Sequence, residues 1–200
     1  MNRTQIINHL TRERSYADYL EIGIGDGQNF RSIQCVRKTA VDPNRPTTFQ
    51  MTSDQFFAAN KQAFDIIFID GLHYANQVLR DIQNALRSLK TGGVVVCHDL
   101  NPQSEEMQKV PRTQMEWTGD CWRAWVQFRS QCPYEMYVLD CDYGVGIIDA
   151  QYAAKYAFVC PDLDLLTYNN FDIQRIGWLN LREPAQWLNS APPPALRKVL

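Results

Sequence analysis

The chain has 200 residues, of which 45% are hydrophobic and 21% charged, and its formal net charge is −2. This composition indicates a globular protein with one sizeable core, and the small net charge argues against a broad nucleic-acid-binding surface. No apolar run is long enough to span a membrane. The N-terminus lacks the apolar core of a signal peptide, so we expect a cytoplasmic protein. The six cysteines have no paired short spacing, which predicts free thiols.

An amphipathic helix is predicted over residues 2–14, and a buried strand over residues 19–22 follows it. The strand runs into a loop with glycine at every second position, namely Gly23, Gly25 and Gly27. Such glycines let the backbone approach a ligand that a Cβ atom would block. A strand, a glycine loop and a helix start in succession predict the ligand-binding corner of a doubly wound α/β fold.

A second strand is predicted over residues 39–41, and it ends at Asp42. Asp42 lies about 20 residues beyond the glycine loop, which is the spacing at which an acid meets a ribose in nucleotide-binding α/β units. We expect residues 47–51 to form a third strand. Ser53 is the predicted N-cap of the helix that follows.

The clearest strand signal is the apolar run 64–71, as expected for a strand buried on both faces of a parallel sheet. A helix with an apolar stripe that reaches Leu89 follows it. The glycine pair at positions 92 and 93 is expected to stop this helix. The next strand is predicted over residues 94–97.

Acids stand in or directly after four of these predicted strands. They are Glu21, Asp42, Asp70 and Asp99. Ligands of open α/β sheets bind at the carboxyl ends of the strands, so we expect the four acids to surround one crevice. The segment 100–118 lacks periodicity and contains two prolines, which predicts a long loop beside that crevice.

Two β-rich runs, 134–139 and 144–148, predict an antiparallel hairpin after a helix that starts near residue 118. From residue 151 the sequence indicates helical or irregular structure, and it ends in a stiff tail that contains Pro192-Pro193-Pro194. We expect one domain over residues 1–200, with residues 151–200 packed on it as an extension.

The charges around the glycine loop indicate the kind of ligand. A triphosphate loop needs Gly-Lys-Ser/Thr, which is absent, and a dinucleotide loop needs its third glycine one residue later. Glu21 and Asp26 would repel a pyrophosphate by roughly 1 kcal/mol or more per close pair. The same carboxylates suit the sulfonium and ammonium groups of S-adenosylmethionine. An NAD-dependent oxidoreductase and a non-catalytic protein that binds S-adenosylmethionine remain as alternatives.

The sequence Glu-x-Gly-x-Gly-x-Gly at 21–27, together with the segments 64–74 and 92–99, resembles the class I S-adenosylmethionine-dependent methyltransferases of family 24. The resemblance covers about residues 17 to 101. It implies a Rossmann-like, doubly wound α/β fold. Its sheet would have seven mostly parallel strands with the last one antiparallel, and helices would cover both faces.

The resemblance also implies roles for individual residues. The cofactor would be bound by Glu21, Gly23, Gly25, Asp42, Ser53, Asp54 and Asp70. In this set Asp42 corresponds to the ribose-binding acid, and Ser53 and Asp54 correspond to the adenine contact. Some relatives hold a divalent cation with acids that end two strands, which here are Asp70 and Asp99, so Mg²⁺ is a candidate second cofactor.

Three residues are candidates for catalysis, namely His73, His98 and Asp99. Methyl transfer to a hydroxyl requires removal of a proton, and a histidine suits a general base near neutral pH. The expected acceptor is a small molecule or a glycan, and Trp117 is the best candidate for contact with it. For the C-terminal aromatic residues the alternatives are a lid, a homodimer face and plain packing.

Overall fold

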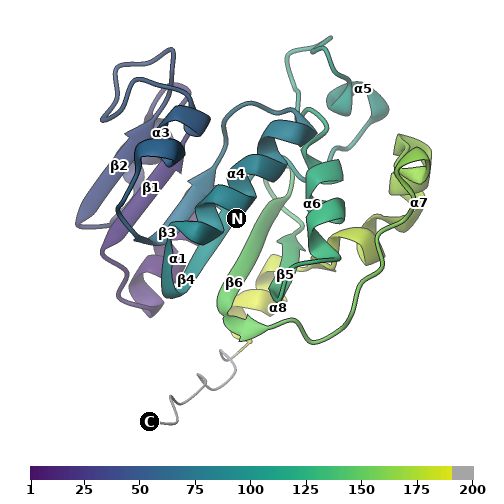
Figure 1. The fold of residues 1–200 in the computed structure, drawn as a ribbon. Coiled ribbons are helices and arrows are strands. Elements are labelled where there is room, and N and C mark those ends of the chain that lie inside the picture. The colour runs from purple at the N-terminus through teal and green to yellow at the C-terminus, as the bar shows by residue number, and fades with distance from the viewer. Residues whose placement is uncertain (191–200) are drawn as a thin grey trace.

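The computed structural model describes residues 1–190, and the predicted tail at Pro192-Pro193-Pro194 lies outside this range. A seven-stranded sheet runs through the described part of the chain in the order β2-β1-β3-β4-β6-β5-β7 (Figure 1). The strands are β1 (Asp18–Ile22), β2 (Arg37–Val41), β3 (Phe64–Ile69), β4 (Leu89–Cys97), β5 (Tyr134–Leu139), β6 (Val145–Ala153) and β7 (Leu181–Arg182). The predicted α/β class with a seven-stranded sheet is confirmed.

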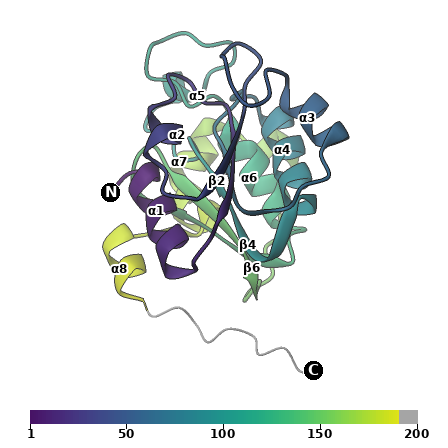
Figure 2. The ribbon, with the colours of Figure 1, turned by 90° about the vertical axis from the view of Figure 1, so that its left-hand side faces the viewer.

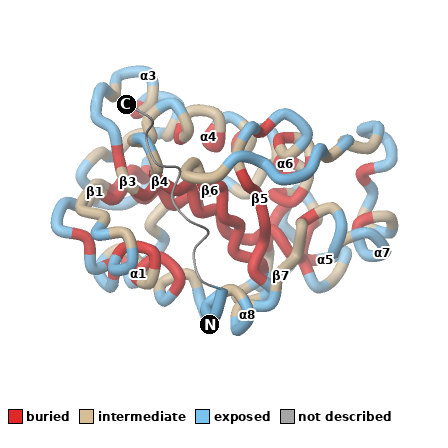
Figure 3. The backbone as a smooth tube through the Cα atoms, turned by 90° about the horizontal axis from the view of Figure 1, so that it is seen from below, coloured by how far each residue is buried: buried red, intermediate tan, exposed pale blue. Residues whose placement is uncertain are grey.

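Helices cover both faces of the sheet (Figures 2 and 3). They are α1 (Arg3–Glu13), α2 (Gln28–Ser32), α3 (Ser53–Ala59), α4 (Ala75–Arg87), α5 (Glu105–Gln108), α6 (Cys121–Arg129), α7 (Tyr168–Leu179) and α8 (Pro184–Asn189), with a 3₁₀ turn at Leu163–Leu165. Alternate side chains of the strands point to opposite faces. One face therefore packs on α3, α4, α6 and α7, and the other packs on α1 and α8. No helix within residues 1–190 is both long and apolar enough to cross a bilayer.

The strands β2, β1, β3 and β4 are parallel, and β6 is antiparallel to both of its neighbours, β4 and β5. The predicted hairpin is therefore confirmed, with β6 extending to Ala153. The antiparallel strand is the sixth along the chain, because a two-residue strand, β7, pairs in parallel with β5 near the end. Since β6 runs against β4, the β5–β6 turn lies beside the carboxyl end of β4, where Cys97 pairs with Gly146.

The expected third strand at 47–51 is wrong. This segment contributes only an isolated bridge, in which Phe49 donates its N–H to the carbonyl of Ala40 at 2.9 Å. Pro43 and Pro46 precede it and remove backbone donors, so the chain meets β2 at the strand end without extending the ladder. The count of seven is reached through β7 at the opposite edge.

Two predicted helix boundaries also differ. The N-cap of α3 is Thr52 rather than Ser53, because Thr52 and Gln55 exchange side-chain and backbone hydrogen bonds in a capping box. Helix α4 ends at Arg87, and Leu89 already belongs to β4. The glycine pair therefore lies inside a strand. A Cβ on Gly93 would stand 2.7 Å from the carbonyl oxygen of Asp65, so close strand packing requires glycine there.

Candidate functional site

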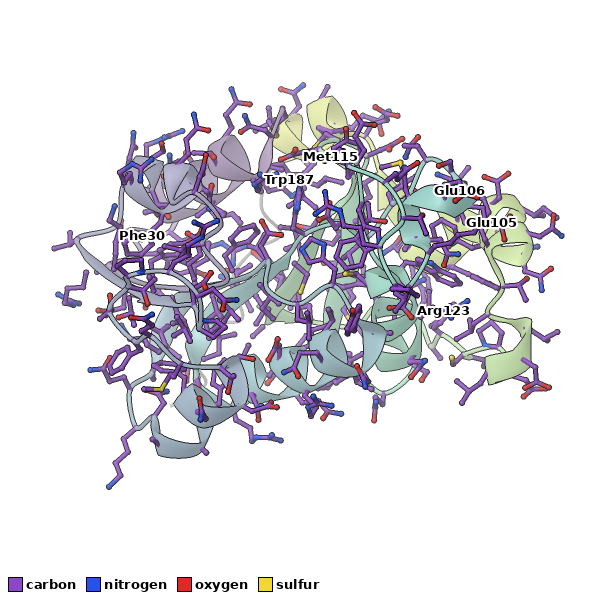
Figure 4. The ribbon with its side chains drawn as sticks, turned by 90° about the horizontal axis from the view of Figure 1, so that it is seen from above. Phe30, Glu105, Glu106, Met115, Arg123 and Trp187 are labelled. Carbon is purple, nitrogen blue, oxygen red and sulfur yellow. The ribbon has the colours of Figure 1, made fainter. Side chains whose placement is uncertain are left out.

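A cavity of about 1050 Å³ opens where the parallel strands end. Viewed from above, α5 with Glu105 and Glu106 lies on the opposite side of the molecule from Phe30 of α2 (Figure 4). The residues that line the cavity come from the starts of α1 and α3, the glycine loop and α2, the turns after β2 and β3, α4, the segment 100–118 and the β5–β6 turn. Of the predicted site residues, Glu21, Gly23, Gly25, Asp42, Ser53, Asp54, Asp70 and His73 line it. His98 and Asp99 do not.

Two positions of the glycine loop require glycine for different reasons. A Cβ atom on Gly23 would stand 2.3 Å from the carbonyl oxygen of Asp70, so this glycine lets the loop pack against the turn after β3. A Cβ atom on Gly25 would meet nothing within 4 Å, because Gly25 faces open space in the cavity wall. Both glycines have positive φ angles, +79° and +52°. The loop thus offers bare backbone to a ligand at Gly25.

Glu21 is buried beside this loop with an exposed fraction of 1%. Its Oε2 atom accepts a hydrogen bond from the hydroxyl of Tyr19 at 2.5 Å and one from the side-chain amide of Asn29 at 3.2 Å. Burial raises the pKa of Glu21 to about 7, although these two hydrogen bonds oppose the shift. A cationic ligand group next to Glu21 would favour its charged form.

The carboxylate of Asp42 fixes the loop geometry from the end of β2. One of its oxygens accepts a hydrogen bond from the N–H of Ile24 at 3.1 Å, and the other accepts one from Asn44 at 2.8 Å. Each oxygen retains a second lone pair for a ligand hydroxyl. Asp42 therefore has the place and the acceptor capacity that binding of a ribose requires.

Gln77 of α4 joins the two residues predicted to contact adenine. Its Nε2 atom lies 3.2 Å from the hydroxyl oxygen of Ser53 and 3.1 Å from the carboxylate of Asp54. Gln77 also lines the cavity, although its sequence position carries no motif. A buried acid in the same helix, Asp81, accepts a third contact from Gln77 at 3.1 Å and keeps this amide in place.

The turn after β3 and the end of β4 bring three predicted residues together. The Nε2 atom of His73 lies 3.2 Å from Asp70, and its Nδ1 atom lies 3.3 Å from Asp99. Burial lowers the pKa of His73, but the hydrogen bond with Asp70 and the charge of Asp99 outweigh burial and raise it. Burial alone would raise the pKa of Asp70. The nearby charge of His98 and the bond with His73 instead hold it well below its usual range.

His98 lies behind this group and meets two residues that the sequence did not identify, Arg3 and Asp142. Its Nε2 atom is 2.9 Å from Nη1 of Arg3 and 3.5 Å from Asp142. Burial lowers the pKa of His98, but the charge of Asp70 and the contacts with Asp142 and Asp99 outweigh it and raise this pKa well above its usual value, so the ring carries the charge that acts on Asp70. The other ring nitrogen is Nδ1. That atom faces Asp70 at 3.4 Å and Asp99 at 3.2 Å.

The backbone is strained in the two turns next to His98, one after β4 and one between β5 and β6. Asp99, Asp142 and Tyr143 have positive φ angles of 60°, 50° and 58°, which non-glycine residues rarely adopt. Gly144 continues the turn, and a Cβ atom there would stand 2.5 Å from the backbone nitrogen of Asn101. The turn is held where it is because Asn101 donates its N–H to the carbonyl of Tyr143 at 2.7 Å.

The cluster also fits a divalent cation by ligand type. Asp70, His73 and Asp99 each offer one ligand atom, and these atoms lie within 4.8 Å of one another. The buried Nδ1 atom of His73 has no well-aligned hydrogen-bond partner. Two carboxylates suit Mg²⁺, and an imidazole also admits a softer ion such as Mn²⁺ or Zn²⁺.

Residues 11–100 match the family model of a methyltransferase domain, methyltransferase family 24. The strand order and the antiparallel β6 agree with this match. The chain has the class I methyltransferase fold. The matched range contains the two loops at 23–27 and 70–73 that carry the sequence motifs, and the family resemblance seen in the sequence is confirmed. No curated protein matches the chain.

Solved methyltransferase structures share the fold at low sequence identity. An O-methyltransferase from Bacillus cereus in complex with SAH is 13% identical with a TM-score of 0.53, and the match covers 74% of this chain and 80% of that one. The O-methyltransferase TomG from Streptomyces achromogenes, involved in tomaymycin synthesis and solved with SAM, is 13% identical with a TM-score of 0.54 and coverages of 74% and 78%. SAH-bound PaMTH1 from Podospora anserina is 13% identical with a TM-score of 0.52 and coverages of 74% and 77%.

Proposed function

We propose that the chain is an S-adenosylmethionine-dependent methyltransferase that acts on a hydroxyl of a small molecule or glycan. One observation carries the proposal: an acid-lined cavity has a bare-backbone cradle at Gly25 on one side and His73 between two carboxylates on the other. The methyltransferase fold and the bound SAM and SAH named for the similar structures support it.

The cavity suits the cofactor by charge as well as by shape. Glu21 and Asp26 lie where the methionine part of the cofactor would approach the loop, and both would attract its ammonium group. Asp42 would bind the ribose hydroxyls, and Ser53 with Asp54 would contact the adenine. A pyrophosphate in the same place would meet these carboxylates instead of bare amides, which speaks against an NAD-dependent oxidoreductase.

The reaction is an in-line displacement at the methyl carbon. The acceptor oxygen forms a bond to this carbon while the carbon–sulfur bond breaks, and the electron pair of that bond stays on sulfur to give S-adenosylhomocysteine. The hydroxyl proton passes to a base of the protein. The residues described above bind and orient both reactants, which supplies proximity and alignment.

His73 is the base that the geometry favours, because it is the predicted catalytic residue that lines the cavity. His98 and Asp99 lie behind it, with Asp99 contacting Nδ1 of His73 at 3.3 Å. We assign Asp99 and His98 to the positioning of His73 and Asp70. Nε2 of His73 donates to Asp70 at 3.2 Å, so an acceptor hydroxyl would have to replace this contact, with the ring proton held on Nδ1 toward Asp99.

A divalent cation is the alternative device for removing the proton. Asp70, His73 and Asp99 would hold it, and the bound cation would lower the pKa of the acceptor hydroxyl. In that case His73 would be a ligand rather than the base. Dialysis against a chelator separates the two models: loss of turnover with recovery on addition of Mg²⁺ or Mn²⁺ supports the cation, and unchanged turnover supports His73 as base.

The proposed function is tested in two steps. Calorimetric titration with S-adenosylmethionine, S-adenosylhomocysteine and NAD⁺ should show binding of the first two in the micromolar range. Tighter binding of NAD⁺ would contradict the proposal. Mass spectrometry then follows S-adenosylhomocysteine formation with a panel of hydroxyl compounds, and binding without turnover on any of them would favour a non-catalytic cofactor-binding protein. The cytoplasmic location and a homodimer stay predictions.

A further inference from the structure

The two arginines that line the cavity differ in whether a carboxylate neutralises them. Six carboxylate residues line it, and they are Glu21, Asp26, Asp42, Asp54, Asp70 and Asp142. Two arginines, Arg3 and Arg112, also do. Arg3 is neutralised inside the protein, because its guanidinium lies 3.2 Å from Asp142 and 3.9 Å from Asp70. Within residues 1–190, no carboxylate lies within ion-pair distance of Arg112.

Backbone carbonyls of its own segment hold Arg112 in place. Its Nε atom donates to the carbonyl of Gln114 at 2.8 Å, and Nη2 donates to the carbonyl of Met115. These contacts orient the guanidinium without cancelling its charge. They leave Nη1 available to a ligand, and a preoriented guanidinium loses less entropy on binding an anion than a free lysine would.

Trp117 contacts both this guanidinium and the candidate base. Its ring stacks on His73 with centroids 5.2 Å apart and an interplanar angle of 18°. The guanidinium carbon of Arg112 lies over the same Trp117 ring at 5.7 Å. Arg112 and His73 therefore contact the same aromatic ring, which is itself anchored by a hydrogen bond from its indole N–H to the carbonyl of Lys109 at 2.6 Å. No hydrogen bond or ion pair within residues 1–190 joins Arg112 to the glycine loop.

We propose that the acceptor carries an anionic group, and that Arg112 binds this group while the hydroxyl to be methylated faces His73. The chemical class is a hydroxylated carboxylate or a hydroxyl compound with a comparable anion. This inference rests on the proposed function, since it assigns the second substrate of the same site. In a cavity lined mainly by acids, an anion without Arg112 would be repelled, so the residue determines specificity.

Matched probes that differ only in charge test the proposal. The wild-type protein is saturated with S-adenosylhomocysteine and titrated by calorimetry with 3,4-dihydroxybenzoate against its amide, and with glucuronate against glucuronamide. At least one acid should bind about tenfold or more tightly than its amide, as expected for a charge-assisted hydrogen bond. Equal affinity within both pairs, or no binding of either acid, overturns the proposal.

Two variants complete the test. Arg112→Gln should remove the preference for the acid while binding S-adenosylhomocysteine as the wild-type protein does, and this binding also shows that the variant is folded. Lys109→Gln is the matched control, because Lys109 lies in the same segment, pairs with Glu106 and does not line the cavity. If Arg112→Gln weakens cofactor binding instead, the guanidinium serves the cofactor and the inference fails. Failure of the wild-type protein to bind S-adenosylhomocysteine would refute the proposed function itself.

Discussion

One side of the cavity comes from parallel strands and the loops that directly follow them, whereas the other side comes from the start of α1, the segment 100–118 and the β5–β6 turn. On the first side the contacts are local: Asn29 reaches Glu21 across 8 positions, and Ile24 reaches Asp42 across 18. On the second side Arg3 contacts Asp142 across 139 positions and His98 across 95.

This difference separates two kinds of function. The local side lies in the segment that matches the methyltransferase family model, and its acids and glycines suit the proposed methyl donor. The distant side depends on how α1, α5 and the hairpin pack, and it carries the arginines and Trp117. A fold that keeps the strand-and-loop side of its cavity constant can accept many substrates when the residues of the other side change. The predictions below probe the two sides in turn.

The largest expected effect is on the local side. Gly25→Val should lower S-adenosylmethionine affinity by more than about 100-fold, because the new side chain would fill the open space in the cradle. Calorimetry measures the affinity, and a thermal melt shows whether the protein stays folded. Gly92→Val is the control, since Gly92 also has a positive φ and meets nothing within 4 Å but lies away from the cavity. Retained micromolar affinity in Gly25→Val would refute the loop assignment.

The next effect separates chemistry from cofactor binding. His73→Gln should reduce kcat by about 100-fold or more, as expected when a general base is lost, while S-adenosylmethionine affinity stays within about threefold. Steady-state kinetics and calorimetry give the two values. His9→Gln, on the partly exposed face of α1, should change neither. If affinity falls as much as kcat in His73→Gln, His73 belongs to the cofactor site.

The third prediction concerns pH and Glu21. Its pKa of about 7 means that the unliganded carboxyl is mostly protonated at pH 6 and mostly charged at pH 8. S-adenosylmethionine should therefore bind about tenfold more tightly at pH 8 than at pH 6, because only the charged form attracts the cation. The folded pKa lies above the ordinary value of 4.5, so the contribution of Glu21 to the stability of the unliganded protein is lost as pH rises from about 4.5 to about 7.

Calorimetry across pH 6 to 8 measures the change in affinity. Glu21→Gln should bind more weakly at pH 8 and lack this dependence on pH. An equal pH dependence in the variant would assign the titration to another group.

The smallest effect tests the corrected helix boundary. Thr52→Ala should lower the free energy of unfolding by about 1 kcal/mol, because it removes the capping box at α3. Ser53→Ala should cost less, since the Gln77 amide that contacts Ser53 also reaches Asp54 and Asp81. Urea denaturation compares the two variants. A larger loss in Ser53→Ala would restore Ser53 as the important residue at this helix start.

Sequence reasoning recovered the features that are encoded within short segments. The strand–glycine–helix unit, the acids after β2 and β3, and the hairpin each show in the order of apolar, polar and glycine residues. It failed at 47–51, where the expected strand contributes only an isolated bridge because the prolines at 43 and 46, just before it, remove backbone donors. It also failed at β7, because two residues carry no periodicity and form a strand only where β5 offers an edge.

The missed site residues have a common cause. Asp142 lies in a hairpin turn, where aspartate is common for conformational reasons and does not indicate a binding site. Its place beside His98 follows from the antiparallel pairing of β6 with β4, which no local pattern specifies. Arg3 reads as an ordinary polar residue of an amphipathic helix. Its role depends on where the helix docks, which the backbone N–H of Arg3 fixes by donating to Asp142 at 2.8 Å.

The sequence by itself determined the glycine-loop side of the cavity, because a strand, its glycine loop and the acid at the next strand end are neighbours along the chain and show in residue type and spacing. Only the tertiary structure decided which histidine lines the cavity, which of the two lining arginines keeps an unpaired charge and which distant segments form the opposite side of the cavity. Burial and ion pairing arise only when distant segments pack. Arg3 and Arg112 therefore look alike in the sequence, but the charge of Arg3 is paired with Asp142 and the charge of Arg112 is available to a ligand.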